Sequence, residues 1–263
     1  MSDRDIKVEV DNGVAWILFN RPAVNNAVRG ETMRQLCEEL DNCIGDADVK
    51  AIVLGSVGNH FVAGAEFSFL EQLAAMNTTQ VQNEVYTVFQ GAARRLYGCP
   101  KPTVAAISGA AITVGCELAI ACDFRIVTPK ALFQESWIKL GLIPPLGGMK
   151  LLPPLVGLSK ATAMILRGVP VRGEEAFKIG LANELVEPKD LRDAAQQYAL
   201  FLAETAPDAY RAAKAGLHRA LESTMEHEWQ ANALAQSILI GTADFREGLD
   251  VVKSKRTPRF GGR

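Results

Sequence analysis

Alternating apolar and polar residues open the chain and soon give way to longer apolar runs. Residues 7–10 (KVEV) and 14–20 (VAWILFN) flank the turn signal DNG, a pattern typical of a β-hairpin. Apolar residues then recur three to four positions apart over residues 31–44, which predicts a helix, and residues 50–56 (KAIVLGS) read as a short buried strand. The beginning of the chain is therefore predicted to fold as strand, strand, helix and strand.

The same two patterns continue to the end of the chain in different proportions. Residues 78–98 are helical in pattern, residues 103–108 (TVAAIS) form a second buried run, and residues 124–133 contain two more short strands. From about residue 147 onward the pattern is mostly helical, with breaks at glycine and proline. Strands dominate the first half and helices the second, which favours an α/β core followed by a helical region.

Composition narrows the possible classes of protein. The chain has 263 residues, of which 48% are hydrophobic and 22% charged, and its net charge is -2. This profile is typical of a globular protein with a large core, and it gives no support for nucleic-acid binding. We place a core at residues 1–195 and a C-terminal helical region at residues 196–263. Residues 104–122 are long enough to span a membrane but contain two glycines and a glutamate, so no span is expected.

The cysteines indicate neither a disulfide framework nor a metal site. There are five of them, at positions 37, 43, 99, 116 and 122, and no two form a CxxC pair. The segment MSDRDIKVEV carries charges where a secretory leader would be apolar. We therefore expect a cytoplasmic protein with buried thiols and no bound metal.

Two segments share a design that suits chemistry at a carbonyl group. In residues 61–70 (FVAGAEFSFL) and 108–118 (SGAAITVGCEL), a strand leads through small residues into a helix. Each turn would present free backbone N–H groups at a helix start, where they can hold a developing negative oxygen. Glu117 is the only acidic or basic residue between Lys101 and Asp123. A carboxylate in such apolar surroundings is paired, protonated or used in catalysis, and here it suggests proton transfer beside the carbonyl.

These segments also carry a resemblance to a known family. The sequence resembles the crotonase superfamily, the enoyl-CoA hydratase and isomerase family, over nearly its whole length. The matching pieces are NRPAVNNAV (20–28), FVAGAEF (61–67), KPTVAAISGAAITVGCELAIACDFRI (101–126), ALFQESWIKLGLIPPLGG (131–148), and the LRGVPV and EEAFKIGLANELV run (166–186).

The resemblance implies a fold, a ligand and an assembly. The fold is an α/β spiral of ββα turns that forms two sheets, followed by a C-terminal helical region. The ligand is an acyl-CoA thioester, so coenzyme A enters as part of the substrate and neither a metal nor another cofactor is needed. The usual assembly is a homotrimer or a dimer of trimers. Apolar residues in the C-terminal helices fit such self-association: Leu217, Leu221, Leu234, Ile238 and Leu249.

Carried over by position, the resemblance also implies roles for individual residues. The two N–H donors of the oxyanion hole fall on Ala65 and Val114, and the first catalytic glutamate falls on Glu117. Contacts to CoA and substrate fall on the following residues: Val24, Asn25, Ala27, Ala63, Ala65, Glu66 and Phe67.

The sequence departs from the family pattern at two functional positions. Val114, preceded by Thr113, stands where glycine is usual, and its branched side chain is expected to resist unusual backbone angles and narrow the pocket. Trp137 replaces the second catalytic glutamate, and an indole cannot exchange a proton. Glu135 shares a face with Trp137 if the segment is extended, so it is a candidate substitute acid, with a solvated or N-capping carboxylate as the alternative. Glu66, where aspartate is common, is a neutral change.

The expected activity is enoyl-CoA hydratase-like, the addition or elimination of water through a thioester enolate. The alternatives are another enolate reaction, hydrolysis or decarboxylation, on a bulky or aromatic acyl-CoA, and a catalytically weak acyl-CoA-binding relative. Pro144 and Pro145 stand where a dehalogenase branch carries its aspartate nucleophile, which argues against dehalogenation. Trp137 is expected to form a flat apolar wall that favours flat or aromatic acyl groups.

Overall fold

The computed structural model describes residues 4–262, so three residues of the predicted core and the last residue of the C-terminal region lie outside it. The strands are β1 (Ile6–Asp11), β2 (Val14–Phe19), β3 (Ala51–Ser56), β4 (Thr103–Ile107), β5 (Ala110–Ile112), β6 (Phe124–Val127), β7 (Leu132–Gln134), β8 (Val171–Arg172) and β9 (Glu184–Leu185). The α-helices are α1 (Gly30–Gly45), α2 (Phe67–Ala74), α3 (Thr78–Val81), α4 (Gln90–Tyr97), α5 (Val114–Ala121), α6 (Gly148–Val156), α7 (Leu158–Arg167), α8 (Gly173–Lys178), α9 (Leu191–Ala203), α10 (Pro207–Ala220), α11 (Met225–Ile240) and α12 (Ala243–Ser254). Four further turns of helix are η1 (Pro22–Val24), the π-helix η2 (Gln82–Phe89), η3 (Trp137–Leu140) and η4 (Pro188–Asp190).

Two sheets organise the core. The larger has the order β1-β2-β3-β4-β6-β9, in which β1 and β2 are antiparallel and the other neighbours are parallel. The smaller has the order β5-β7-β8. Asn12 and Gly13 both have positive φ (51° and 78°), which is the geometry of a tight hairpin turn between twisted strands. The predicted hairpin is therefore confirmed, as are the predicted helices and strands up to residue 134.

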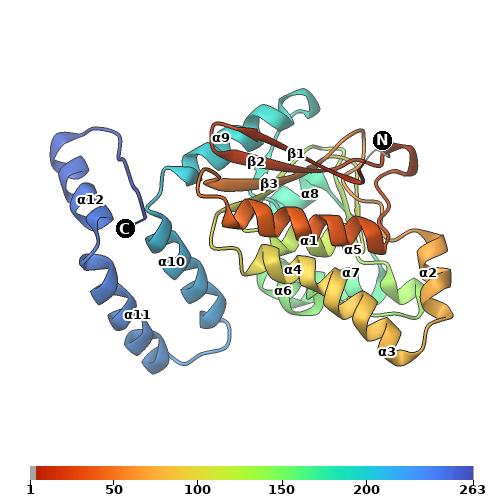
Figure 1. Ribbon diagram of the computed structural model, residues 1–263. Coiled ribbons are helices and arrows are strands. Elements are labelled where there is room, and N and C mark those ends of the chain that lie inside the picture. Colours follow the sequence, from red (N-terminus) through yellow and green to blue (C-terminus); the bar gives the residue numbers. More distant parts are fainter. Residues whose placement is uncertain (1–3, 263) are drawn as a thin grey trace.

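The strands β2, β3 and β4 of the larger sheet are buried on both faces. All six residues of β2 are buried, and alternate residues point to opposite sides because the side-chain period of a strand is two. Ala15, Ile17 and Phe19 join a core covered by α1, α4 and α5, whereas Val14, Trp16 and Leu18 join a core covered by α9. Helices thus cover both faces of the sheet, as Figure 1 shows. The boundary expected at residue 195 falls inside α9.

The smaller sheet brings the two predicted turns together. Val62, just before the first turn, forms a bridge with Ala111 of β5, just before the second turn. The N–H of Val62 donates to the carbonyl oxygen of Ala110 (2.8 Å), and the N–H of Ile112 donates to that of Val62 (2.9 Å). Segments almost fifty residues apart in sequence therefore lie side by side.

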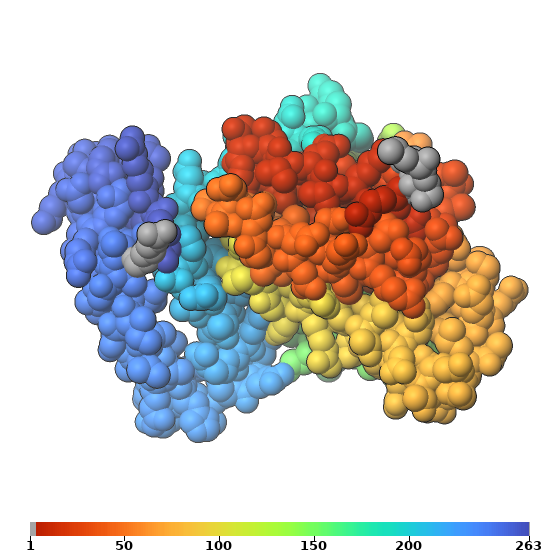
Figure 2. Space-filling model, in the orientation of Figure 1, coloured from red at the N-terminus to blue at the C-terminus, as the bar shows by residue number. Residues whose placement is uncertain are grey.

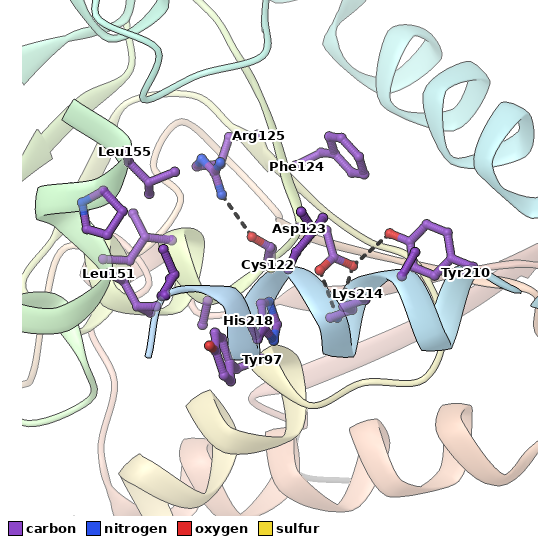
Figure 3. Close-up of a pocket in the computed structure, with 16 residues that line it drawn as sticks. Tyr97, Cys122, Asp123, Phe124, Arg125, Leu151, Leu155, Tyr210, Lys214 and His218 are labelled. Carbon is purple, nitrogen blue, oxygen red and sulfur yellow. Dashed lines mark hydrogen bonds and ion pairs between the residues drawn. The ribbon is translucent and has the colours of Figure 1, made fainter. Parts of the chain in front are cut away.

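The C-terminal helices extend away from the sheets. Figure 1 shows α10 beside the core, with α11 and α12 beyond it, and in Figure 2 they form the blue lobe at the left of the molecule. Asp123 anchors α10, because its carboxylate pairs with the ammonium group of Lys214 (2.8 Å) and accepts the hydroxyl proton of Tyr210 (3.0 Å). Figure 3 shows these contacts, and the His218 ring stacked on Tyr97, around a mostly apolar pocket of about 370 Å³.

Three features differ from the sequence-based picture. The two-residue strands β8 and β9 lie in the part predicted as mostly helical, and the helical stretch over residues 78–97 contains the π-helix η2. The C-terminal tail, also in the part predicted as mostly helical, is not helical and packs back on α12. The N–H groups of Gly261 and Gly262 donate to the Asp244 carboxylate (2.8 and 2.9 Å), and Arg256 pairs with Glu247.

Candidate active site

The first turn places a free N–H group at Ala65. Gly64 has φ +105°, a conformation that residues with a Cβ rarely adopt. On either side of Ala65, the N–H of Val28 donates to the carbonyl oxygen of Gly64 (2.8 Å) and the N–H of Glu66 donates to that of Val28 (2.9 Å). The Ala65 N–H itself has no acceptor within residues 4–262. The turn is thus held in place by its neighbours while this donor stays available.

The second turn does the same at Val114, the first residue of α5. Thr113, just before the helix, has φ 50° and ψ -108°. Its N–H donates to the carbonyl oxygen of Gln134 (2.7 Å), which fixes the turn against β7. In the described part of the chain the Val114 N–H meets no acceptor, as expected for the first residue of a helix. The unusual backbone angles therefore fall on Thr113 and not on Val114. The expectation that Val114 would have to adopt them was wrong, because the residue before it does so.

Glu117 lies one turn into α5 with its carboxylate held by three donors. The N–H groups of Leu146 and Gly148 both donate to Oε1 at 2.8 Å, and the indole N–H of Trp137 donates to Oε2 at 3.1 Å. The side chain is fully buried. An ionised carboxylate has about four acceptor positions, so one position on Glu117 remains for a water molecule or a substrate proton.

Burial and hydrogen bonding act in opposite directions on this group. Burial raises the pKa of Glu117, and the donors from Gly148, Leu146 and Trp137 lower it, which leaves the pKa at about 7. A general base works best when its pKa lies near the operating pH. Glu117 therefore has the fixed orientation and the proton affinity that proton transfer at neutral pH requires.

An apolar cavity of about 490 Å³ is bounded by the first turn and by the tryptophan that donates to Glu117. Ala65 and Trp137 are both part of its wall, and so is Pro145, next to the loop that binds Glu117. The rest of the wall comes from α2, the helical stretch over residues 78–97, the end of η3 and the segment after it: Phe69, Leu70, Leu73, Ala74, Val81, Val85, Tyr86, Phe89, Leu140, Leu142 and Ile143. The Phe69 and Phe89 rings stack with centroids 5.1 Å apart. No side chain that carries a charge lines this cavity.

Comparison with known proteins agrees with this geometry. The family model described as enoyl-CoA hydratase/isomerase matches residues 9–263. The chain belongs to the enoyl-CoA hydratase/isomerase family. It is 34% identical to a probable enoyl-CoA hydratase of Rhodobacter capsulatus over the full length of both, and 30% identical to a crotonyl-CoA hydratase of Syntrophomonas wolfei over 99% of each. A solved structure of a putative enoyl-CoA hydratase from Streptomyces coelicolor superimposes with a TM-score of 0.93 at 31% identity, covering 99% of this chain and 95% of that one. The crotonase fold expected from the sequence is thereby confirmed.

The residues predicted to contact CoA in this hydratase/isomerase family member lie on two neighbouring segments. The N–H of Ala63 donates to the carbonyl oxygen of Asn25 (3.2 Å), which joins the two segments. The Glu66 carboxylate forms an ion pair with Arg21. The predicted set otherwise comprises the exposed residues Val24 and Phe67, the partly buried Ala27, and Ala65. The structure contains no CoA, so their contacts with it stay predictions.

Glu135, the candidate substitute acid, is as fully buried as Glu117 but lacks hydrogen-bond donors. Neither carboxyl group lines the apolar cavity. Burial is the largest influence on the carboxyl group of Glu135, followed by the nearby Glu117, and together they raise the pKa of Glu135 well above its usual range. Trp137, by contrast, lines the cavity as predicted, and it also contacts Glu117 directly.

Several residues that complete the site have no obvious signal in the sequence. The N–H groups of Leu146 and Gly148 are backbone donors about thirty residues beyond Glu117, and only the paired glycines of LGG mark the place. His60 accepts the N–H of Ala110 at Nδ1 (3.0 Å) and so supports the second turn. Across residues 4–262 no group of three His, Cys, Asp or Glu side chains is arranged to hold a metal ion, and no helix there is long and apolar enough to cross a membrane.

Proposed function

We propose that this protein adds water to the double bond of an enoyl-CoA thioester, with Glu117 as the only carboxylate that contacts the reacting atoms. One observation carries the proposal. A buried carboxylate, oriented by three donors and left with one free acceptor position, is bound by Trp137 in the wall of a cavity that Ala65, with an N–H group that has no acceptor in the described chain, also lines. The full-length similarity to proteins named enoyl-CoA hydratases supports this reaction over other carbonyl chemistry.

The proposed mechanism uses the two turns and the carboxylate together. The thioester oxygen accepts hydrogen bonds from the N–H groups of Ala65 and Val114, which stabilise the negative charge it gains. Water bound to Glu117 attacks Cβ of the double bond while the carboxylate takes one of its protons, and the electron pair of the double bond moves to form the enolate. The protonated Glu117 then returns that proton to Cα, which regenerates the carboxylate. The product is a 3-hydroxyacyl-CoA, and no metal or further cofactor is required.

Trp137 explains how a single carboxylate can serve. Its indole N–H donates to Oε2 of Glu117, which fills one acceptor position and helps to fix the orientation of the carboxylate. The indole cannot exchange protons, so the second proton-transfer group of a two-glutamate hydratase is absent from this position. Both proton steps therefore fall to Glu117, and double-bond isomerisation, which in the family generally relies on the second position, is less favoured than hydration.

The cavity indicates which acyl groups fit. Its wall is apolar except for the hydroxyl group of Tyr86, and it holds no charged side chain that would pair with a carboxylate on the substrate. A charged group buried there without a partner would cost several kcal/mol. Aromatic side chains, namely Phe69, Phe89 and Trp137, offer flat faces on which an acyl group can stack. We therefore propose a neutral acyl group, longer than crotonyl or aromatic.

A panel of CoA thioesters tests the activity and its specificity. Crotonyl-, octenoyl- and cinnamoyl-type enoyl-CoAs would be compared with an enoyl-CoA that carries a terminal carboxylate, using mass spectrometry of the products. A gain of one water on the apolar substrates, with little or none on the carboxylated one, is expected. Release of free CoA or loss of CO₂ would instead favour hydrolysis or decarboxylation. Tight binding without turnover across the panel would favour a weak acyl-CoA-binding relative.

Self-association through the C-terminal helices is also proposed. Leu217, Leu234 and Ile238 each expose about two-thirds of their surface, and Trp229 exposes 62%. An exposed apolar row of this kind is typical of a protein-protein contact. A homotrimer or a dimer of trimers is expected in light scattering at micromolar concentration, and a monomer would contradict it. The five free cysteines, four of them buried, fit a reducing compartment such as the cytoplasm.

A further inference from the structure

The Glu135 carboxyl group has surroundings unlike those of any other buried polar side chain in the described chain. It follows β7 and has no exposed surface. Its two oxygens are the only fully buried side-chain oxygen or nitrogen atoms within residues 4–262 that lack a hydrogen-bond partner. Buried polar groups are nearly always satisfied, so an exception calls for a physical reason.

The titratable neighbours of Glu135 lie on α5. Glu117 is close enough to interact electrostatically, and the Cys116 thiol is adjacent. The buried cation of this region, Arg125, donates to the carbonyl oxygens of Leu181 and Cys122, beyond the other end of α5. On the flanking segments Lys139 and Arg167 are exposed. No cation therefore pairs with either carboxyl group in residues 4–262.

The donors are divided unequally between the two carboxyl groups. Glu117 accepts three hydrogen bonds, two from backbone N–H groups and one from an indole. Glu135 accepts none with acceptable geometry. Donors stabilise an ionised carboxylate, whereas burial without donors strongly disfavours it, and two ionised carboxylates near each other disfavour it further.

We propose that Glu117 and Glu135 form a buried carboxyl pair that shares one proton and one negative charge at neutral pH, with the proton on Glu135 and the charge on Glu117. Glu135 is then a positioning residue, since it acts on the substrate only through Glu117. By staying neutral it leaves Glu117 as the only negative charge beside the thioester. The raised pKa of Glu135 agrees with this assignment.

The dependence of stability on pH tests the proton on Glu135 directly. In the unfolded chain Glu135 ionises near its ordinary pKa of 4.5, whereas in the folded protein it keeps its proton to a much higher pH. The folded native protein therefore loses stability relative to Glu135→Gln as the pH rises above 4.5. The unfolding equilibrium constant of the native protein, divided by that of Glu135→Gln, should grow about tenfold per pH unit. Urea unfolding at pH 5.5, 6.5, 7.5 and 8.5 measures this ratio.

Glu117→Gln is the matched control, because Glu117 is equally buried but carries donors. The unfolding equilibrium constant of the native protein, divided by that of Glu117→Gln, should grow over the same range. It should level off near pH 7, where folded Glu117 ionises. A ratio for Glu135→Gln that is constant above pH 5.5 would overturn the proposal, since Glu135 would then be ionised in the fold.

Infrared spectroscopy provides a second readout that does not depend on how well a variant folds. The native protein at pH 8.5, where Glu117 is ionised, should show the carbonyl stretch of a protonated carboxylic acid, and Glu135→Gln or Glu135→Met should lack it. Absence of that band in the native protein would also overturn the proposal. Neither measurement uses turnover, so its failure is distinguishable from failure of the proposed hydration.

Discussion

The two turns proposed to hold the thioester oxygen share this role but reach it with different residues. At the first turn, Gly64 adopts φ +105°, which costs glycine little. At the second, Thr113 adopts φ 50° with ψ -108°, which a branched residue adopts only under constraint. The second turn therefore stores strain that the first turn avoids.

Their contact explains why the residues are not interchangeable. A Cβ added at Gly64 would lie 2.8 Å from the Thr113 hydroxyl oxygen, which is too close for an unchanged structure. The missing side chain at the first turn thus leaves space for the threonine at the second. Glu117 depends on the second turn as well, because its N–H donates to the Thr113 carbonyl oxygen (3.0 Å). The strained turn positions both the donor at Val114 and the proposed base.

Glu117→Gln would separate the binding contributed by the turns from the proton transfer. The amide keeps the shape of the side chain but cannot act as a base, so kcat should fall by about 10²- to 10⁴-fold. Binding of a non-reactive saturated acyl-CoA, measured by calorimetry, should change little because both N–H donors remain. A variant that kept more than about a tenth of the native kcat would show that another group handles the proton.

Gly64→Ala would break the first turn and disturb the second. The new Cβ meets both the unfavourable φ and the Thr113 hydroxyl, so a loss of about 2 kcal/mol in stability is expected. Misplacement of an oxyanion donor should lower kcat by roughly 10²-fold. The control is Gly64→Ala combined with Thr113→Gly, which removes the clash but keeps the strain at residue 64. Recovery of part of the lost activity is expected, and no recovery would show that the two turns act independently.

Trp137→Phe would keep the flat wall and remove only the N–H group. Without this donor, the pKa of Glu117 should rise above 7 by about one unit, because hydrogen bonds to a charged group stabilise its ionised form. A base must be ionised, so kcat/KM should fall about tenfold at pH 6 and little at pH 9. An unchanged pH profile of kcat/KM would mean that the indole N–H does not act on Glu117.

Thr113→Gly should have the smallest effect and the opposite sign. Relief of backbone strain, offset by the greater freedom of glycine in the unfolded chain, should raise stability by about 1 kcal/mol. Urea unfolding measures the change, and Thr128→Gly, in the same core but outside the turn, should destabilise instead. If Thr113→Gly were less stable than the native protein, the threonine would not be strained.

The sequence predicted most of what local patterns determine. The hairpin, the main helices, both turns and the isolated Glu117 follow from hydrophobic period, small residues and charge spacing. What it did not predict depends on contacts between distant segments. The donors from Leu146 and Gly148 to Glu117, the cavity wall from α2 to η2, and the burial of Glu135 arise only when those segments pack together. The strands β8 and β9 have two residues each, too few to show a period.

The most direct test of the one-carboxylate mechanism is hydration of an apolar enoyl-CoA in D₂O, followed by proton NMR of the product. A single carboxylate on one side of the double bond serves both the attacking water and Cα. The expected product therefore carries one deuterium at Cα, on the same face as the new hydroxyl group at Cβ. Deuterium on the opposite face would contradict the account, because a second proton donor would then be required across the substrate from Glu117.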